Sequence, residues 1–338
     1  MIASVRRWAR RRRRGPLRAP ALVLAYHRFS TAGPDPWALG VAPQHFVEHL
    51  SLLRRRYRVA SLAGLVRDVA ASAVQPGTVV ITADDGYADD FLVAAPLLAQ
   101  GDTPATFFVT TGGVDAPAGF WWDELAARLL TEGRLPPELV IPDGPGWTLG
   151  DAATLDGPSA ARFGRWRATE PPPTPRHRLY LDLWRTLQPM APAARAAALQ
   201  GLRAAWGDAP GKTPAHRTMT SDELRALSSI APIELGAHGC THRPLDGLDA
   251  RTLSDEIGQS RLALEEITER RVRAFAYPHG AHDEAARRAV ANAGMACACT
   301  SAMGGVSSTT DPYAIPRLHI QDWSADDLEE HLFWWFGR

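Results

Sequence analysis

The chain has 338 residues, 45% of them hydrophobic, and its 37 basic and 37 acidic residues give a formal net charge of zero at pH 7. This length suits one α/β barrel with insertions, and the apolar share is ordinary for a protein with a buried core. A balanced charge provides no global field that favours nucleic acid, so no nucleic-acid partner is expected. The three cysteines form no even disulfide set, which favours buried free thiols in a reducing compartment.

The first 20 residues are strongly basic, with eight arginines between Arg6 and Arg18. They lack the apolar run of a secretory signal, and no window of the chain reaches the apolar length of a membrane span. We therefore interpret residues 1–20 as a disordered, solvated tail. The expected location is cytoplasmic, or peripheral at the inner face of a membrane. Contact of the arginines with anionic lipid is the alternative role for this tail.

Seven short apolar runs recur along the chain, and each leads into polar or glycine-rich residues. They are Leu22–His27, Thr78–Asp84, Ala105–Thr111, Pro232–His238, Val272–Pro278, Ala296–Ser301 and Ala314–Ile320. Stretches with helical spacing separate most of them, and Thr220 and Glu223 have the spacing of a capping box. Strands that alternate with helices predict a parallel sheet with covered faces. Seven strands favour a closed or nearly closed barrel over residues 21–338.

The alternation breaks between about residues 120 and 215, in a stretch rich in Ala, Pro and Trp. Helices are predicted there at Trp122–Leu130, Arg176–Leu187 and Ala193–Trp206. We interpret this stretch as a mostly helical insertion on the barrel and not as a separate domain.

Two adjacent carboxylates follow the second apolar run, in Thr82-Ala83-Asp84-Asp85-Gly86. Parallel α/β folds place ligands and catalytic groups at the carboxyl ends of strands. Neighbouring carboxylates repel each other unless a cation or a shared proton intervenes, and one can bind a metal while the other faces a water molecule. A plain Asp-Asp-Gly turn that caps the next helix is the structural alternative.

Two histidines four residues apart follow the fourth run, in His238-Gly239-Cys240-Thr241-His242. They can converge on one metal if the segment turns. Together with Asp85 they form a set of two imidazoles and one carboxylate with open positions, which suits zinc or a similar divalent ion. A purely structural histidine pair is the alternative.

A third polar group, Phe275-Ala276-Tyr277-Pro278-His279-Gly280, follows the fifth run. Pro278 and Gly280 would rigidify a loop, and Tyr277 could offer a wall or a hydroxyl to a ligand. Backbone amides near Tyr277 could bind an oxyanion. A simple strand-exit turn explains the pattern equally well, with His279 facing solvent.

In this order, the three motifs resemble those of the polysaccharide deacetylase family (carbohydrate esterase family 4). Leu24–Arg28 and Ala105–Val109 resemble the family as well, so the similarity spans roughly residues 21–323. The resemblance implies a distorted (β/α)7 barrel that hydrolyses the acyl group of an acetamido sugar. It further implies Asp84 as the general base.

The same resemblance assigns Asp85, His238 and His242 to a divalent metal, with Zn²⁺ expected and Co²⁺, Ni²⁺ or Fe²⁺ as alternatives. It implies His319, in the last run, as the acid for the leaving amine, against the alternative of a polar residue at a strand exit. His27 is expected either to line the site or to pack beneath it.

The chain departs from the family at Ala276, where many members carry an arginine that orients the catalytic carboxylate. We predict that Arg317 reaches Asp84 instead. Gly239 stands where Ser or Thr often follows the first metal histidine, so a hydrogen bond that supports this ligand is either missing here or supplied by Thr241.

The predicted function is removal of an N-acetyl group from an N-acetylhexosamine in a polysaccharide, glycolipid or saccharide precursor. The alternatives are an O-acetyl esterase or a non-sugar amidase on the same scaffold, and a catalytically silent glycan-binding protein. Ala276 is the only support for the last of these. Trp122 could stack on a sugar ring, although anchoring of the insertion is the simpler role for it.

Overall fold

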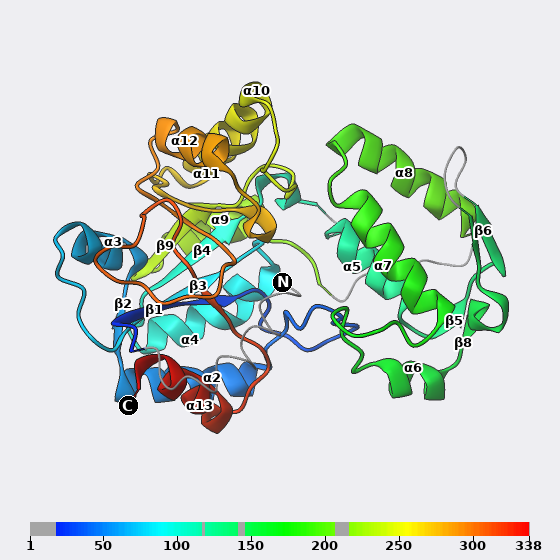
Figure 1. Ribbon diagram of the computed structural model, residues 1–338, viewed down its shortest axis with the longest axis horizontal. Coiled ribbons are helices and arrows are strands. Elements are labelled where there is room, and N and C mark those ends of the chain that lie inside the picture. The colour runs from blue at the N-terminus through cyan, green and yellow to red at the C-terminus, as the bar shows by residue number, and fades with distance from the viewer. Residues whose placement is uncertain (1–17, 117–118, 141–145, 207–215, 338) are drawn as a thin grey trace. The chain divides into compact units, whose positions relative to one another are not determined.

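The structure is a computed structural model that describes residues 18–116, 119–140, 146–206 and 216–337. The chain divides into two compact units (Figure 1). Unit 1 comprises the described residues of 1–31, 39–115 and 218–338, and unit 2 comprises those of 32–38 and 116–217. Most of the basic tail predicted at the N-terminus lies outside the described residues. Among the described residues, no helix is both long enough and apolar enough to cross a membrane.

Unit 1 is built on an eight-stranded sheet with the order β11-β10-β9-β4-β3-β1-β12, in which β2 also pairs with β3. Every pair of neighbouring strands is parallel. The strands are β1 (Ala21–Tyr26), β2 (Arg58–Ala60), β3 (Thr78–Ala83), β4 (Ala105–Val109), β9 (Ile233–Ala237), β10 (Ala274–Ala276), β11 (Cys297–Cys299) and β12 (Leu318–His319). Six of the seven predicted runs contain one of these strands, and β1 begins one residue before the first run. The sequence pattern misses β2, a three-residue strand that begins at the exposed Arg58.

The last segment of the sheet brings the barrel almost to closure. β12 pairs with β1, with Leu318 opposite Leu24. On the other side, the amide of Ile315 donates to the carbonyl of Ala298 at 2.9 Å, and the amide of Thr300 donates to the carbonyl of Ile315 at 2.8 Å. The predicted distorted barrel is therefore confirmed. β1 and β3 are buried along their whole length, as continuous apolar runs in parallel sheets require.

Helices surround this sheet, and α13 packs against α2 while α10 packs against α12 (Figure 1). Thr220 caps α9 with a complete capping box, as its spacing with Glu223 predicts. The helical elements are α2 (Pro43–Arg56), α3 (Leu62–Ala70), η2 (Asp90–Ala94), α4 (Ala95–Gln100), η3 (Thr111–Gly113), α9 (Ser221–Ser228), α10 (Ala250–Ser254), η5 (Asp255–Gln259), α11 (Ser260–Thr268), η6 (Pro278–Gly280), α12 (Glu284–Asn292) and α13 (Ala325–Phe336).

Unit 2 is mostly helical, and α5 packs against α7. Three of its helices agree with the predicted ranges to within one residue at each end, whereas α6 and two small antiparallel hairpins are not predicted. Its elements are α5 (Trp121–Leu129), β5 (Gly133–Arg134), β6 (Glu138–Val140), β7 (Gly146–Thr148), η4 (Gly150–Ala153), β8 (Thr154–Leu155), α6 (Gly157–Phe163), α7 (Pro175–Leu187) and α8 (Pro192–Ala205). The hairpins pair β5 with β8 and β6 with β7.

A buried arginine completes the end of α5 in unit 2. The guanidinium of Arg176 donates to the carbonyls of Leu129 at 2.5 Å, Arg128 at 2.9 Å and Gly133 at 2.9 Å. The last carbonyls of a helix have no partner within it, so this side chain satisfies groups that burial would otherwise leave unbonded.

Candidate metal and catalytic site

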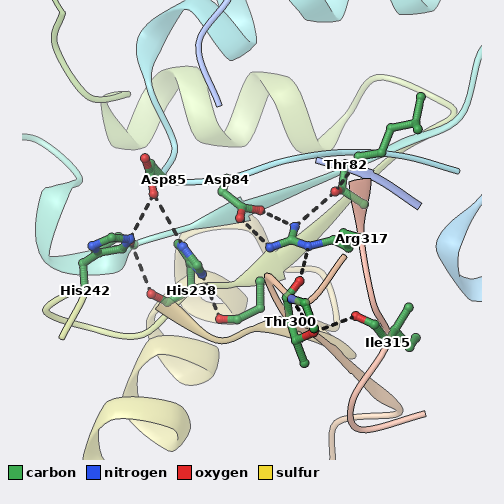
Figure 2. A network of polar contacts seen from close by, with 12 residues as sticks. Thr82, Asp84, Asp85, His238, His242, Thr300, Ile315 and Arg317 are labelled. Atoms are coloured by element: carbon green, nitrogen blue, oxygen red, sulfur yellow. Dashed lines mark hydrogen bonds and ion pairs between the residues drawn. The ribbon is translucent and has the colours of Figure 1, made fainter. Parts of the chain in front are cut away.

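Polar side chains from distant segments meet at the carboxyl ends of the strands of unit 1 (Figure 2). Asp84 and Asp85 follow β3, His238 follows β9, and Arg317 directly precedes β12. Figure 2 shows the rings of His238 and of His242 directed at Asp85, while Arg317 is directed at Asp84. The two adjacent aspartates thus have different partners.

Asp85, His238 and His242 form a buried group whose ligand atoms all lie within 4.8 Å of one another. Oδ1 of Asp85 lies 3.1 Å from Nε2 of His242 and 3.5 Å from Nε2 of His238. Zinc–ligand bonds of about 2.0–2.1 Å place neighbouring donor atoms about 3.3 Å apart around a tetrahedral ion. The spacing and the chemistry of these three donors therefore fit a divalent ion with open positions.

A backbone carbonyl fixes the orientation of the first histidine. Nδ1 of His238 donates to the carbonyl of Ala276 at 2.8 Å, which leaves Nε2, the nitrogen that faces Asp85, available to an ion. Metal-binding histidines are commonly held by a hydrogen bond of this kind on the other ring nitrogen. Ala276 thus contributes to the site through its main chain, although it lacks the side chain that many deacetylases carry there.

The chain turns sharply after β3 because two consecutive residues adopt left-handed backbone angles. The φ angles are 80° at Asp85 and 89° at Gly86. A Cβ atom at Gly86 would lie only 2.9 Å from Cγ1 of Val109. The position therefore requires glycine both for its positive φ angle and for the lack of space beside it. The turn separates the directions of the two aspartates.

Asp84 is gripped by a fully buried arginine, as predicted for Arg317. Its two guanidinium nitrogens donate to the two carboxylate oxygens of Asp84 at 2.7 and 2.6 Å. Arg317 also donates to the hydroxyl of Thr82 at 3.2 Å and to the carbonyl of Thr300 at 3.0 Å. Burial raises the pKa of Asp84, but the charges of Arg317 and His238 and the hydrogen bonds from Arg317 together outweigh burial and lower the pKa to about 2. Asp84 is therefore an oriented, ionised carboxylate.

His319 lies on β12 with its ring stacked on His27, at 5.6 Å between ring centres and 19° between planes. Its Nε2 has no hydrogen-bond partner within the described part of the chain. Burial, and then the charges of His27 and Arg317, lower the pKa of His319 to about 3. Burial also lowers the pKa of His27, against the attraction of Asp85. Both rings are neutral at pH 7, so His319 can act as an acid only after it gains a proton.

Tyr277 does not line the site, contrary to the prediction. Its side chain is fully buried, its hydroxyl donates to the carbonyl of Tyr313 at 3.1 Å, and its amide donates to Cys299 at 3.0 Å. The backbone hydrogen bonds between β10 and β11 continue one residue beyond β10, and the amide of Tyr277 takes part in them. Neither this amide nor the Tyr277 hydroxyl is therefore available to a substrate. Pro278 is buried in η6 and serves the turn.

Trp122 is buried in unit 2, which favours anchoring of the insertion over stacking on a sugar, the two roles predicted for it. Its side chain is only 6% exposed in unit 2, and its ring stacks on Phe120 with centres 4.2 Å apart and planes 11° apart. One aromatic face is thus already covered.

His279 is half-buried and does not simply face solvent as predicted. The residue has a φ of 56°, and its ring meets that of His242 edge to face at 4.5 Å between centres. Its position between Pro278 and Gly280, in the rigid loop after β10, was the available signal. The pattern also misses Glu256, a buried carboxylate that contacts the segment between the two histidines.

These features define a parallel α/β barrel with an Asp-His-His group beside an arginine-held carboxylate, which is the arrangement that the resemblance to the deacetylases implies. The sequence model described as polysaccharide deacetylase matches residues 211–298, a segment that contains His238 and His242 but not Asp84. The resemblance of this chain to the polysaccharide deacetylase family is thereby confirmed. No curated protein matches the sequence of the chain.

Solved structures of deacetylases share the fold across nearly the whole chain. The deacetylase PplD of Streptococcus pyogenes, in complex with acetate, is 16% identical with a TM-score of 0.55, over 93% of this chain and 98% of that one. IcaB from Ammonifex degensii is 15% identical with a TM-score of 0.57, over 94% and 97%. A de-N-acetylase from Aggregatibacter actinomycetemcomitans is 14% identical with a TM-score of 0.53, over 92% and 98%. At these identities the likeness establishes the fold.

Proposed function

We propose that this protein is a metal-dependent hydrolase that removes the N-acetyl group from an N-acetylhexosamine of a polysaccharide, glycolipid or saccharide precursor. The observation that carries the proposal is that one buried site contains both a group of three possible ion ligands, Asp85, His238 and His242, and a second carboxylate, Asp84, held by Arg317. The match to the polysaccharide deacetylase family supports the same reaction class.

Asp85, His238 and His242 would hold the ion, and Zn²⁺ suits two imidazoles and a carboxylate, although Co²⁺, Ni²⁺ and Fe²⁺ accept the same donors. When bound, such an ion lowers the pKa of water and polarises an amide carbonyl. Asp85 is ionised in the site: burial raises its pKa, but His242 and the other neighbours lower it well below its usual range.

Asp84 would accept the proton of the attacking water. Arg317 occupies one lone pair on each carboxylate oxygen, and a carboxylate has about four acceptor positions, so others remain for the water. Attack forms the new C–O bond of acetate, and the C–N bond of the acetamido group then breaks. The departing amine needs a proton, for which His319 is the proposed donor once it has been protonated.

Conversion of Asp84 to Asn tests this assignment, because Asn cannot take up the proton but leaves the three ion ligands in place. We expect Asp84→Asn to keep about one divalent ion per chain and to lose about 10²–10⁴-fold of acetate release. The measurements are metal analysis and acetate release from chito-oligosaccharides, with acetylated xylan as the ester substrate.

Asp68→Asn is a matched control, because Asp68 pairs with Arg58 at 3.2 Å in a partly exposed position in the same unit. It should keep both the ion and the activity. Full activity in the Asp84→Asn variant would contradict the mechanism, and wild-type protein that binds no divalent ion would contradict the proposed function. Release from xylan alone would favour an O-acetyl esterase.

A further inference from the structure

The segment between the two histidine ligands is a tight turn and not a helix or a strand. β9 ends at Ala237, and the φ angles of Gly239 and His242 are 76° and 54°. Histidines four residues apart face the same side of a helix automatically, but after a strand they converge only if the turn is held. The relative position of His238 and His242 therefore depends on whatever fixes residues 239–241.

A single buried carboxylate binds this turn from one side. Glu256, in the π-helical turn η5, is 5% exposed. Its Oε2 accepts from the amides of Cys240 at 2.9 Å and Thr241 at 3.0 Å, and its Oε1 accepts from the hydroxyl of Thr241 at 2.5 Å. Three donors of the turn thus converge on one side chain. The hydroxyl of Thr241 is thus bonded to Glu256.

The opposite side of the turn is bonded to the segment after β4. The amide of Thr111 donates to the carbonyl of Gly239 at 3.1 Å, and the amide of Gly112 donates to the carbonyl of Cys240 at 2.8 Å. The amides of the turn therefore face Glu256, while its carbonyls face this segment. Removal of Glu256 would leave buried amides without an acceptor, and the turn would relax toward other conformations.

A carboxylate satisfies this contact better than a neutral carboxamide would. Two amides and a hydroxyl all need acceptors, and hydrogen bonds to an ionised acceptor are roughly twice as strong as neutral ones. A Gln at position 256 would have one acceptor oxygen instead of two, so its NH₂ group would face either a backbone amide or the Thr241 hydroxyl, which would then have to accept instead of donate. Gly239 fits the same arrangement, because a Cβ there would lie 3.2 Å from Oε2 of Glu256.

We propose that Glu256 is a positioning residue that sets the geometry of the His238–His242 pair and thereby the affinity of the site for its divalent ion. The inference rests on the proposed function. Glu256 acts through the backbone of the turn and touches neither the ion nor the substrate.

The test is the affinity of metal-free protein for Zn²⁺, measured by competition with a chromophoric chelator, and the visible absorption spectrum of the Co²⁺-loaded protein. Loss of a group that orients a metal ligand typically weakens binding about 10–100-fold, and we expect this for Glu256→Gln together with a changed Co²⁺ spectrum. Thr241→Val, which removes one of the three donors and keeps both amides, should weaken binding less and in the same direction.

Glu265→Gln is the matched control. Glu265 lies on α11, accepts from the amide of Val272 at 3.0 Å and pairs with Arg261 at 3.1 Å. Its loss should lower thermal stability and leave Zn²⁺ affinity unchanged.

Three results would overturn the inference and one would bear on the proposed function instead. Wild-type affinity in Glu256→Gln would remove the inference, and so would an equal loss of affinity in Glu265→Gln, which would indicate a general effect of destabilisation. If Glu256→Gln does not fold, wild-type affinity and an unchanged spectrum in Thr241→Val would also count against it. Absence of any Zn²⁺ or Co²⁺ binding by the wild type would contradict the proposed function itself.

Discussion

Each unit contains a fully buried arginine, and the two serve different ends. In unit 1, Arg317 binds both oxygens of Asp84, whereas in unit 2 Arg176 binds only backbone carbonyls. Burial lowers the pKa of Arg176 to about 10. Burial also acts to lower the pKa of Arg317, but the charge and hydrogen bonds of Asp84 outweigh burial and raise this pKa above its usual value. In unit 1 the ion pair with Arg317 keeps Asp84 ionised and fixes its orientation. In unit 2 the guanidinium of Arg176 donates to the carbonyls at the end of α5.

The histidines of the two units differ in the same way. His177 in unit 2 lies edge to face against Phe163 and Trp166, and burial lowers its pKa to about 4. His238 in unit 1 is also penalised by burial, yet Asp84 and Asp85 raise its pKa above the usual value. Burial alone thus gives a structural residue, and burial next to carboxylates gives a site that suits a cation.

The largest effect on this comparison is expected from Arg317→Met. The change leaves Asp84 buried without its counter-charge, and breaking a buried ion pair in this way costs about 3–5 kcal/mol. Urea denaturation measures the loss, and acetate release should fall with it because Asp84 loses its orientation. Arg58→Met removes a partly exposed pair with Asp68 and should cost less than about 1 kcal/mol. Equal costs for the two variants would break the contrast between buried pair and exposed pair.

His319→Ala should have the next largest effect, on turnover alone. General acid catalysis contributes at least about 10²-fold, which corresponds to about 2.7 kcal/mol of barrier. Bound metal, by contrast, should stay near the wild-type level, since His319 is not one of the three ion ligands. Steady-state kinetics and metal analysis on the same preparation separate the two. Unchanged turnover would remove His319 from the mechanism.

Arg176→Met tests the structural arginine of unit 2. Its loss takes a donor from the carbonyl of the buried Leu129 and from that of the exposed Gly133, which we expect to cost about 2 kcal/mol. Hydrogen exchange should show faster opening of α5, while Zn²⁺ affinity stays the same because every ion ligand lies in unit 1. If Arg176→Met weakened Zn²⁺ binding as well as the hydrogen-exchange protection of α5, the two buried arginines would not be functionally distinct.

The smallest effect is expected at Asp90, a fully buried carboxyl group in unit 1. Within the described part of the chain neither of its oxygens has a hydrogen-bond partner. Burial, and then the charges of Asp89, Asp85 and Asp84, raise its pKa well above the usual value. The folded chain therefore keeps a proton that the unfolded chain loses above about pH 4, so this group's stability contribution is complete below that pH and is lost as pH rises.

Asp90→Asn removes this dependence, because the amide does not ionise. Urea denaturation should be measured from about pH 4 to pH 8. The free energy of unfolding of the variant, relative to the wild type, should rise with pH, by about 1 kcal/mol or more at pH 8. A difference that stays constant over this range would show that the carboxyl group ionises as easily in the folded chain as in the unfolded one.

The sequence was sufficient for the local elements of the fold. Continuous apolar runs predict all seven strands of the barrel path, because strands buried on both faces have few polar positions. Helical spacing predicts α5, α7 and α8 in unit 2. The short strand β2 and the hairpins of two or three residues carry too little pattern to be recognised.

The sequence by itself determined the kinds of chemical groups at the carboxyl ends of the strands, because motif spacing and strand ends are local properties. Only the tertiary structure decided which groups meet and which are withdrawn. Arg317 reaches Asp84 from 233 residues away, and Glu256 reaches the turn before His242 from the following helical segment. The side chains of Tyr277 and Trp122 are buried. These outcomes depend on strand order, register and the packing of opposite faces, and a run of neighbouring residues does not specify them.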